Sequence, residues 1–203
     1  GTNLIAVGTA MTPSIYVSTN AGLTWIAPAL PPVKDWTSVA VSGDGGRAVA
    51  VPAHASLSYV FISPDGGKTW SQRTTPGSRA WSAVATSSNG TNIVAVAASA
   101  VWLSFDGGET WLQNVSLPAL TWKSAAMSAD GQKQAIGADK IYVSKNGGTN
   151  WSVLGSPTGN FVALAMSRDG ERIVAASNGG QIITSVDGGT NWVARPGAGT
   201  TRA

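Results

Sequence analysis

One octapeptide pattern recurs five times along this chain and constrains its fold more than any other feature. The copies begin at Ser18, Ser63, Ser104, Ser144 and Ser185 and read STNAGLTW, SPDGGKTW, SFDGGETW, SKNGGTNW and SVDGGTNW. Successive copies are separated by 45, 41, 40 and 41 residues. Self-similarity at a fixed step of this size is the signature of repeat architectures, in which each repeat is one supersecondary unit. The chain must therefore fold as five copies of one unit.

Each unit contains four predicted strands, which we name A to D in chain order. Strand A begins with an aromatic residue, at Trp36, Trp81, Trp122 or Phe161, and is followed by an Asp-Gly or Asn-Gly turn, a strong hairpin signal. Strand B is a short apolar run. Strand C ends at the serine of the octapeptide, which is itself the hairpin between strands C and D. Four strands per repeat, without helical periodicity, predict an all-β fold: a β-propeller of five four-stranded blades.

The repeat also sets the expected domain organisation. We expect one propeller domain over residues 1–203, with units at about 1–35, 36–80, 81–121, 122–160 and 161–203. GTNLIAV at residues 1–7 aligns with GTNIVAV at residues 90–96, so the first unit begins at strand B and lacks strand A.

Three sources of the missing strand are open. About ten further residues after Ala203, beginning with an aromatic residue, would close a five-blade ring, because propellers commonly close with strands from both termini. A partner subunit could donate the strand instead. In the third case, the five blades are part of a larger propeller.

The residues of the octapeptide predict a structural role. A short Asp or Asn side chain at its third position accepts hydrogen bonds from backbone N–H groups of a tight turn, and glycine at the fifth permits backbone angles that a Cβ forbids. The final tryptophan is expected to pack between sheets, where its loss costs about 3–5 kcal/mol. The structural residues predicted in this way are Asn20, Asp65, Asp106, Asn146 and Asp187, with Trp25, Trp70, Trp111, Trp151 and Trp192.

The S-x-[DN]-x-G-x-[TN]-W octapeptides resemble Asp-box, or BNR, repeats. Such repeats occur in sialidases, xyloglucan-cleaving glycosidases, sortilin-type receptors and photosystem II assembly factors. The resemblance covers all five units and implies a propeller in which the box is a structural turn on the outer part of each blade, away from the ligand site. It is specific for fold and not for function. Asn20 and Asn146 depart from the Asp of the motif, but Asn can make the same turn.

The sequence offers little for catalysis. Six of the ten acidic residues are the aspartates of the boxes and A–B turns, which leaves Asp35, Glu109, Asp139 and Glu171. Of these, Glu109 lies inside a box and Glu171 directly after a hairpin, so both are expected to be solvated. A glycosidase needs two carboxylates facing each other across the substrate, and nothing in the repeat pairs Asp35 with Asp139. The Arg-Ile-Pro segment of sialidases is absent, and all three tyrosines lie in strand C, where blade packing is expected. With a single histidine and no cysteine, we predict no enzyme activity, no cofactor and no metal site.

Charge and hydropathy restrict the possible partners. The chain has 13 Lys and Arg against 10 Asp and Glu, a net charge of +3, and no two basic residues are adjacent. Nucleic-acid surfaces need basic clusters or stripes, so this pattern argues against nucleic acid as the partner. The longest nearly apolar run, Ile93–Leu103, is too short to span a membrane as a helix, and no membrane span is predicted. The compartment is left open, with an extracellular or exported one favoured.

The loops predict where a ligand binds. In a propeller, the A–B and C–D hairpins lie on one face, and the B–C and D–A loops lie on the other. The D–A loops differ between units whereas the octapeptides do not, and variable loops on a rigid scaffold commonly carry binding. The candidate ligand-face residues are Lys34, Arg73, Arg79 and Arg195 in D–A loops and His54 in a B–C loop, with Lys123 and Lys140 near the same rim. Ordinary solvent-exposed side chains are the alternative interpretation.

The sequence therefore favours a non-catalytic propeller that binds or scaffolds a protein or a glycan through its B–C and D–A loops. The alternatives are a secreted, lectin-like carbohydrate-binding module and a non-catalytic part of a larger glycosidase.

Overall fold

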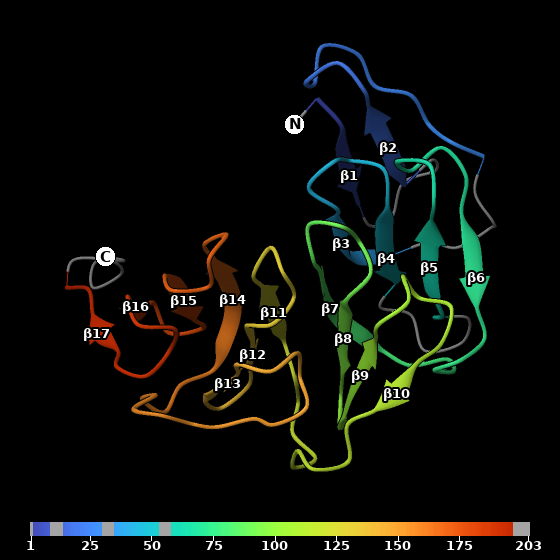
Figure 1. Cartoon of the computed structure of the whole chain (residues 1–203). Coiled ribbons are helices and arrows are strands. Elements are labelled where there is room, and N and C mark those ends of the chain that lie inside the picture. Colours follow the sequence, from blue (N-terminus) through green and yellow to red (C-terminus); the bar gives the residue numbers. More distant parts are fainter. Residues whose placement is uncertain (1, 9–13, 30–34, 53–57, 197–203) are drawn as a thin grey trace.

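The chain folds into five antiparallel β-sheets that follow one another along an open arc (Figure 1). The computed structural model describes residues 2–8, 14–29, 35–52 and 58–196, and within these ranges every regular element is a strand. The predicted all-β fold of propeller blades is confirmed. The same ranges contain no helix of the length and hydropathy needed to cross a membrane.

The sheets are named blades 1 to 5 in chain order. Blade 1 pairs β1 (Leu4–Val7) with β2 (Ile15–Ser18). Blade 2 has the order β3-β4-β5-β6, over Trp36–Val41, Ala48–Pro52, Val60–Ser63 and Ser71–Arg73. Blade 3 has the order β7-β8-β9-β10, over Trp81–Thr86, Ile93–Ala97, Ala100–Ser104 and Leu112–Gln113. Blade 4 has the order β11-β12-β13, over Ser124–Met127, Gln134–Gly137 and Ile141–Ser144. Blade 5 has the order β14-β15-β16-β17, over Phe161–Met166, Ile173–Ser177, Ile182–Ser185 and Val193–Ala194.

In two of the blades, a single isolated β-bridge occupies the position expected for strand D. Val17 pairs with Ile26 in blade 1, and Val143 pairs with Ser152 in blade 4. The described part of blade 1 thus contains strands B and C and a bridge at the position of strand D, without a strand A. Blades 1 and 5 lie at opposite ends of the arc (Figure 1), and the source of a closing strand stays a prediction.

The turn between strands A and B is built from a Ser-x-Asp/Asn-Gly sequence. In blade 2 the Ser42 hydroxyl donates to the Asp44 carboxylate at 2.6 Å, and this carboxylate accepts from the Gly46 N–H at 2.9 Å. Gly45 takes a φ of 75°, a conformation that glycine adopts without strain. Equivalent Ser–Asp/Asn hydrogen bonds close the turns of blades 3, 4 and 5. The A–B turns therefore follow from a local sequence repeated in each blade.

The hydrophobic core lies between blades rather than in a single centre. We call the side of a blade that faces the next blade in chain order its forward face, and the opposite side its rear face. In the cluster between blades 2 and 3, Val49 and Ile62 of blade 2 pack against Trp81, Ile93 and Trp111 of blade 3. Equivalent clusters join blades 1 and 2, 3 and 4, and 4 and 5. Each blade is thus stabilised mainly by its neighbours, as in other repeat proteins.

The second glycine of the box is required by this packing. Ile62, directly before the box serine, presses on Gly108 of the next blade, where an added Cβ would lie 2.6 Å from Ile62 Cδ1. Leu103 presses on Gly148 and Val143 on Gly189 in the same way. These glycines also have φ near 90°, which L side chains rarely adopt. The box therefore serves the contact between blades as well as its own hairpin.

Candidate functional site

The box forms a closed network of hydrogen bonds, seen clearly in blade 3. The Asp106 carboxylate accepts from the backbone N–H groups of Glu109 and Thr110, at 3.0 and 2.9 Å. The Ser104 hydroxyl donates to Asp106 at 2.8 Å and accepts from the Gly108 N–H at 2.8 Å. The indole N–H of Trp111 donates to the Gly108 carbonyl at 3.0 Å. The other four boxes contain the same Ser, Asp or Asn, and Trp contacts.

These hydrogen bonds hold the box carboxylates in their ionised form. Partial burial raises the pKa of Asp106, but hydrogen bonds from Thr110, Ser104 and Glu109 outweigh it and lower this pKa to about 2. In Asp187, the backbone and side-chain hydrogen bonds from Asn191, followed by that from Ser185, lower the pKa to about 2. A carboxylate with so low a pKa is a poor proton donor at neutral pH, so the boxes are suited to structure rather than to acid–base chemistry.

The box and the A–B turn of each blade meet on one side of the molecule, which we call the box face. The Gly66 N–H donates to the Gly46 carbonyl at 2.8 Å, and the Gly107 N–H donates to the Thr91 carbonyl at 2.8 Å. The corresponding bonds in the other blades run from Ala21 to Thr2, from Gly147 to Gln132 and from Gly188 to Glu171. The polar groups of the box face are therefore largely engaged with one another.

The four acidic residues other than the box and A–B turn aspartates have different surroundings. Glu109 forms an ion pair with Arg73, and Glu171 forms one with Lys133 of the preceding blade. Asp35 is also engaged, and Asp139 lies exposed in a B–C turn. In the described ranges, no group of three or more His, Cys, Asp or Glu side chains could hold a metal ion.

The candidate ligand-face arginines make different contacts and do not form one rim. The Arg73 guanidinium donates to the Gly108 carbonyl at 3.0 Å as well as pairing with Glu109, so it binds the box of blade 3. Arg195 Nε donates to the Thr184 hydroxyl at 2.8 Å within blade 5. Lys34 and His54 lie outside the described residues.

Arg79 lies beside the B–C and D–A loops, on the side that we call the loop face. Its backbone N–H donates to the Ser58 carbonyl at 3.1 Å, and its Nε donates to the Pro76 carbonyl at 3.1 Å. Its guanidinium lies 5.1 Å from the centroid of the Trp102 ring, within the range of a cation–π interaction. Trp102 thus has a packing role, and Arg79 is a positive group held in place on the loop face.

The D–A loops are bound to the B–C turns by backbone hydrogen bonds. The Ser99 N–H donates to the Leu120 carbonyl and the Gly159 N–H donates to the Asp139 carbonyl, both at 2.8 Å. The Asn178 N–H donates to the Asn160 carbonyl at 2.8 Å. These bonds make this part of the loop face a fixed surface.

A depression of about 280 Å³ opens on the loop face beside blade 4. Its lining includes Lys123, Asp139 and Asn160, with Leu120, Thr121, Ala138 and Gly159 completing it. Among the described residues, neither Lys123 nor Asp139 takes part in an ion pair. The sequence placed Lys123 near this rim and treated Asp139 only as an acid outside the turns. The antiparallel β11–β12 pair, with Ser124 opposite Gly137, brings both residues to the same end of blade 4.

Comparisons with solved structures place this fold among β-propellers. A chain of the crystal structure of the Nidogen/Laminin complex is 14% identical, with 98% of this chain and 79% of that chain covered and a TM-score of 0.72. An ancestral GH74 enzyme is 20% identical, with 90% and 28% covered and a TM-score of 0.68. The GH74 xyloglucanase from Xanthomonas campestris is 17% identical, with 96% and 36% covered and a TM-score of 0.68.

These likenesses concern the fold alone, because the sequence identities are low. The present chain spans about a third of the length of the two GH74 chains. No protein-family model matches the sequence, and no curated protein matches it either. The structural neighbours include both enzymes and proteins from non-enzymatic assemblies, so function must be argued from the site.

Proposed function

We propose that this run of β-propeller blades is a non-catalytic module that binds a protein ligand through its loop face. The observation that carries the proposal is the depression beside blade 4, where Lys123 and Asp139 lie without ion-pair partners among the described residues. A depression that offers one positive and one negative side chain is complementary to a peptide segment that carries both charges. Asn160 adds an amide able to donate to and accept from a peptide backbone.

Two further observations support a binding role. The box face engages its own polar groups, whereas the loop face holds the exposed Asp139 and the half-buried Lys123 beside a backbone fixed by hydrogen bonds. Rigid loops of this kind bind at a lower entropic cost than mobile ones. One structural neighbour belongs to a protein–protein complex, Nidogen/Laminin, which gives a precedent for this type of scaffold in protein recognition.

The test uses a peptide array and a glycan array, each probed with the full chain and three variants. Lys123→Glu and Asp139→Lys reverse the charges of the depression. Lys145→Glu is the matched control, because its ammonium group contacts Thr190 on the box face. We expect peptides with both an acidic and a basic residue to bind, and either reversal in the depression to weaken binding at least tenfold, about 1.4 kcal/mol.

The outcomes separate the alternatives. Equal effects of Lys123→Glu and Lys145→Glu would refute the assignment to the loop face. Binding to the glycan array alone, sensitive to Lys123→Glu, would favour the lectin-like alternative. Release of reducing sugar from xyloglucan by this chain would refute the non-catalytic assignment, both for a binding module and for a non-catalytic part of a larger glycosidase of the GH74 type. We expect no such release, because the carboxylates of the boxes and A–B turns are engaged in turn hydrogen bonds.

A further inference from the structure

The forward face of blade 5 is built like the buried forward faces of the other blades. Val174 occupies the position of Val49, Val94 and Ala135, which are each at most 1% exposed in blades 2, 3 and 4. Val174 itself is 41% exposed, because no described strand packs on it. It lies in a depression of about 450 Å³ that is also lined by Arg172, Thr184 and Arg195. The apolar part of an interface between blades is therefore present here without its partner.

The first polar link between blades is a backbone hydrogen bond from one A–B turn to the next. The Gly43 N–H donates to the Ser88 carbonyl at 2.7 Å, the Ser88 N–H to the Ala129 carbonyl at 2.8 Å, and the Ala129 N–H to the Arg168 carbonyl at 2.8 Å. The next donor in this series is the Arg168 N–H, which has no acceptor among the described residues.

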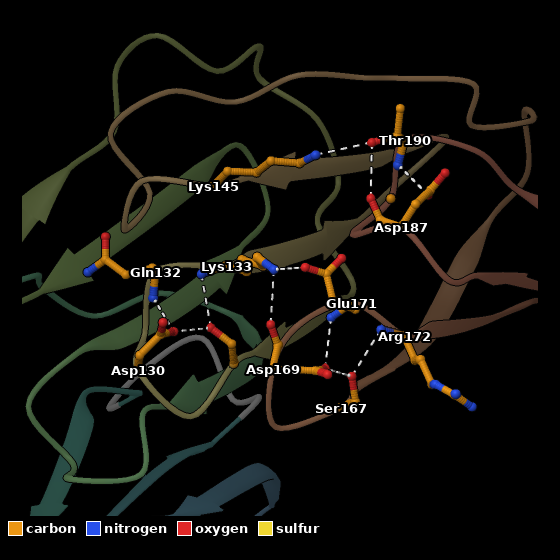
Figure 2. Close-up of polar contacts among 12 residues, drawn as sticks. Asp130, Gln132, Lys133, Lys145, Ser167, Asp169, Glu171, Arg172, Asp187 and Thr190 are labelled. Carbon is orange, nitrogen blue, oxygen red and sulfur yellow. Dashed lines mark hydrogen bonds and ion pairs between the residues drawn. The ribbon is translucent and has the colours of Figure 1, made fainter.

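The second link comes from the side chain that opens strand B. Asn3 donates to the Gly45 carbonyl at 3.0 Å and Asn92 to the Asp130 carbonyl at 3.3 Å, both in the A–B turn of the next blade. Lys133 donates to the Asp169 carbonyl at 3.0 Å and forms an ion pair with Glu171 (Figure 2). Arg172 is the corresponding residue of blade 5. Figure 2 shows its guanidinium pointing away from the other labelled side chains. The Arg172 backbone N–H donates to the Ser167 hydroxyl, but the guanidinium has no hydrogen-bond partner among the described residues.

The third link comes from the third residue after the box tryptophan. Arg73 donates to the Gly108 carbonyl and pairs with Glu109, and Asn114 donates to the Gly148 carbonyl at 3.0 Å. In both cases the acceptor is the second box glycine of the next blade. Arg195 is the corresponding residue of blade 5, and it contacts Thr184 of its own blade instead.

We propose that the forward face of blade 5 docks a further blade of the same box repeat, and that it selects a blade with two acidic residues. One acid follows the second box glycine, as Glu109 does, and pairs with Arg195. The other follows the A–B turn glycine, as Glu171 does, and pairs with Arg172. The proposal continues an interface that the chain already forms between its own blades, and it is independent of the ligand proposed for the loop face.

A second copy of this chain fits the face poorly. Its blades 2 to 5 have their rear faces covered, which leaves blade 1. That blade has Leu23 after the box glycine, no charged residue in residues 2–29, and no strand A among its described residues. The packing between blades depends on strand A, since β7 contacts both β3 and β4 of the preceding blade, and β14 contacts β11 and β12.

The test exploits the absence of cysteine from the sequence. Val174→Cys places one thiol on the face, and Val94→Cys places one at the equivalent buried position as the control. Each variant is prepared in two forms: the full chain, and the full chain extended by a second copy of residues 81–121. In the appended copy Thr91 is replaced by Glu, so that the copy carries both proposed acids, this Glu and Glu109. The rate of thiol reaction with a maleimide is measured for each protein.

We expect the extension to slow the reaction of the Val174→Cys thiol at least tenfold and to leave the Val94→Cys rate unchanged. Glu109→Arg in the appended copy should restore fast reaction, and Arg195→Glu combined with it should restore protection.

An unchanged rate overturns the proposal, whether or not the appended copy resists proteolysis. Equal protection by a copy with Glu109→Gln and Thr91 retained overturns the selection for acids. A rate that falls with the concentration of the unextended chain shows that a second copy occupies the face, which also overturns the proposal.

Discussion

The third position of the box shows how little chemistry is needed to close the hairpin between strands C and D. Three boxes carry Asp and two carry Asn, yet the same side-chain oxygen accepts from the backbone in each. The Thr24 N–H donates to Asn20 Oδ1, and the Asn150 N–H donates to Asn146 Oδ1, both at 2.9 Å. The carbonyl-like oxygen is therefore the essential group, and the negative charge is not.

This equivalence predicts the effect of two substitutions at Asp106. Asp106→Ala removes the acceptor for the Glu109 and Thr110 N–H groups and should lower the free energy of unfolding by about 1–3 kcal/mol. Asp106→Asn keeps the acceptor and should cost clearly less. Urea unfolding followed by tryptophan fluorescence measures both. Equal losses in the two variants would show that the charge, and not the turn geometry, stabilises the box.

The low pKa of Asp106 predicts acid sensitivity. The folded-state pKa of about 2 lies below the ordinary value of 3.8, so the ionised carboxylate stabilises the fold above about pH 4. This stabilisation is lost as the pH falls from about 4 towards 2, because the unfolded chain then binds more protons than the folded one. Asp106→Asn should therefore show a smaller drop in the urea midpoint over this range than the wild type. An identical pH profile would contradict the role of the Asp106 charge.

At the scale of the strand and the hairpin, the box tryptophan packs against the preceding blade. Trp111 joins the cluster between blades 2 and 3 and is 5% exposed. Trp25 belongs to blade 1, which no described blade precedes, and it is 42% exposed although it makes the same indole hydrogen bond. Residues that share a motif position thus differ in burial because of the position of their blade in the arc.

Trp111→Ala should accordingly cost about 3–5 kcal/mol, the range for a large buried aromatic residue. Trp25→Ala should cost much less, because less of its ring leaves water on folding. Both substitutions remove the same side-chain atoms from the wild type, so each variant is the control for the other in urea unfolding. If their costs are the same, the indole hydrogen bond rather than the packing between blades is the main contribution.

Sequence reasoning reached the hairpins because their causes are local. The hydrogen bonds of the Ser-x-Asp/Asn-Gly turns and of the boxes form between residues a few positions apart, so the sequence pattern alone predicts them. The contacts of Arg73 with Gly108 and Glu109 depend on which blades face each other, and no local pattern encodes that. Alignment of Arg73 with Asn114 and Arg195, each three residues after a box tryptophan, is the signal that could have indicated a role between blades.

At the scale of the whole molecule, stability should vary along the arc. Blade 3 is packed on both faces, whereas among the described strands blade 1 is packed only by blade 2 and blade 5 only by blade 4. In repeat proteins each unit draws its stability from its nearest neighbours, so the end units open at lower free energy.

Hydrogen exchange followed by mass spectrometry can test this gradient. Amides of β8 should exchange more slowly than those of β1 and β15, which are the corresponding strand B of blades 1 and 5. Uniform protection of the three strands would show that the arc opens as one cooperative unit. In the extended chain described above, protection of β15 should rise towards that of β8 if the appended copy docks.

The backbone hydrogen bonds that join the A–B turns give the arc a polarity. Every donor from Gly43 to Ala129 points toward the next blade, so one end of the series presents a carbonyl group, on Gly43, and the other an amide, on Arg168. Such a series has a head and a tail, like a polar filament. A blade brought up in reverse would place N–H against N–H, and a buried donor without an acceptor costs about 1–3 kcal/mol. Growth or closure of the arc is therefore favoured in one direction over the other.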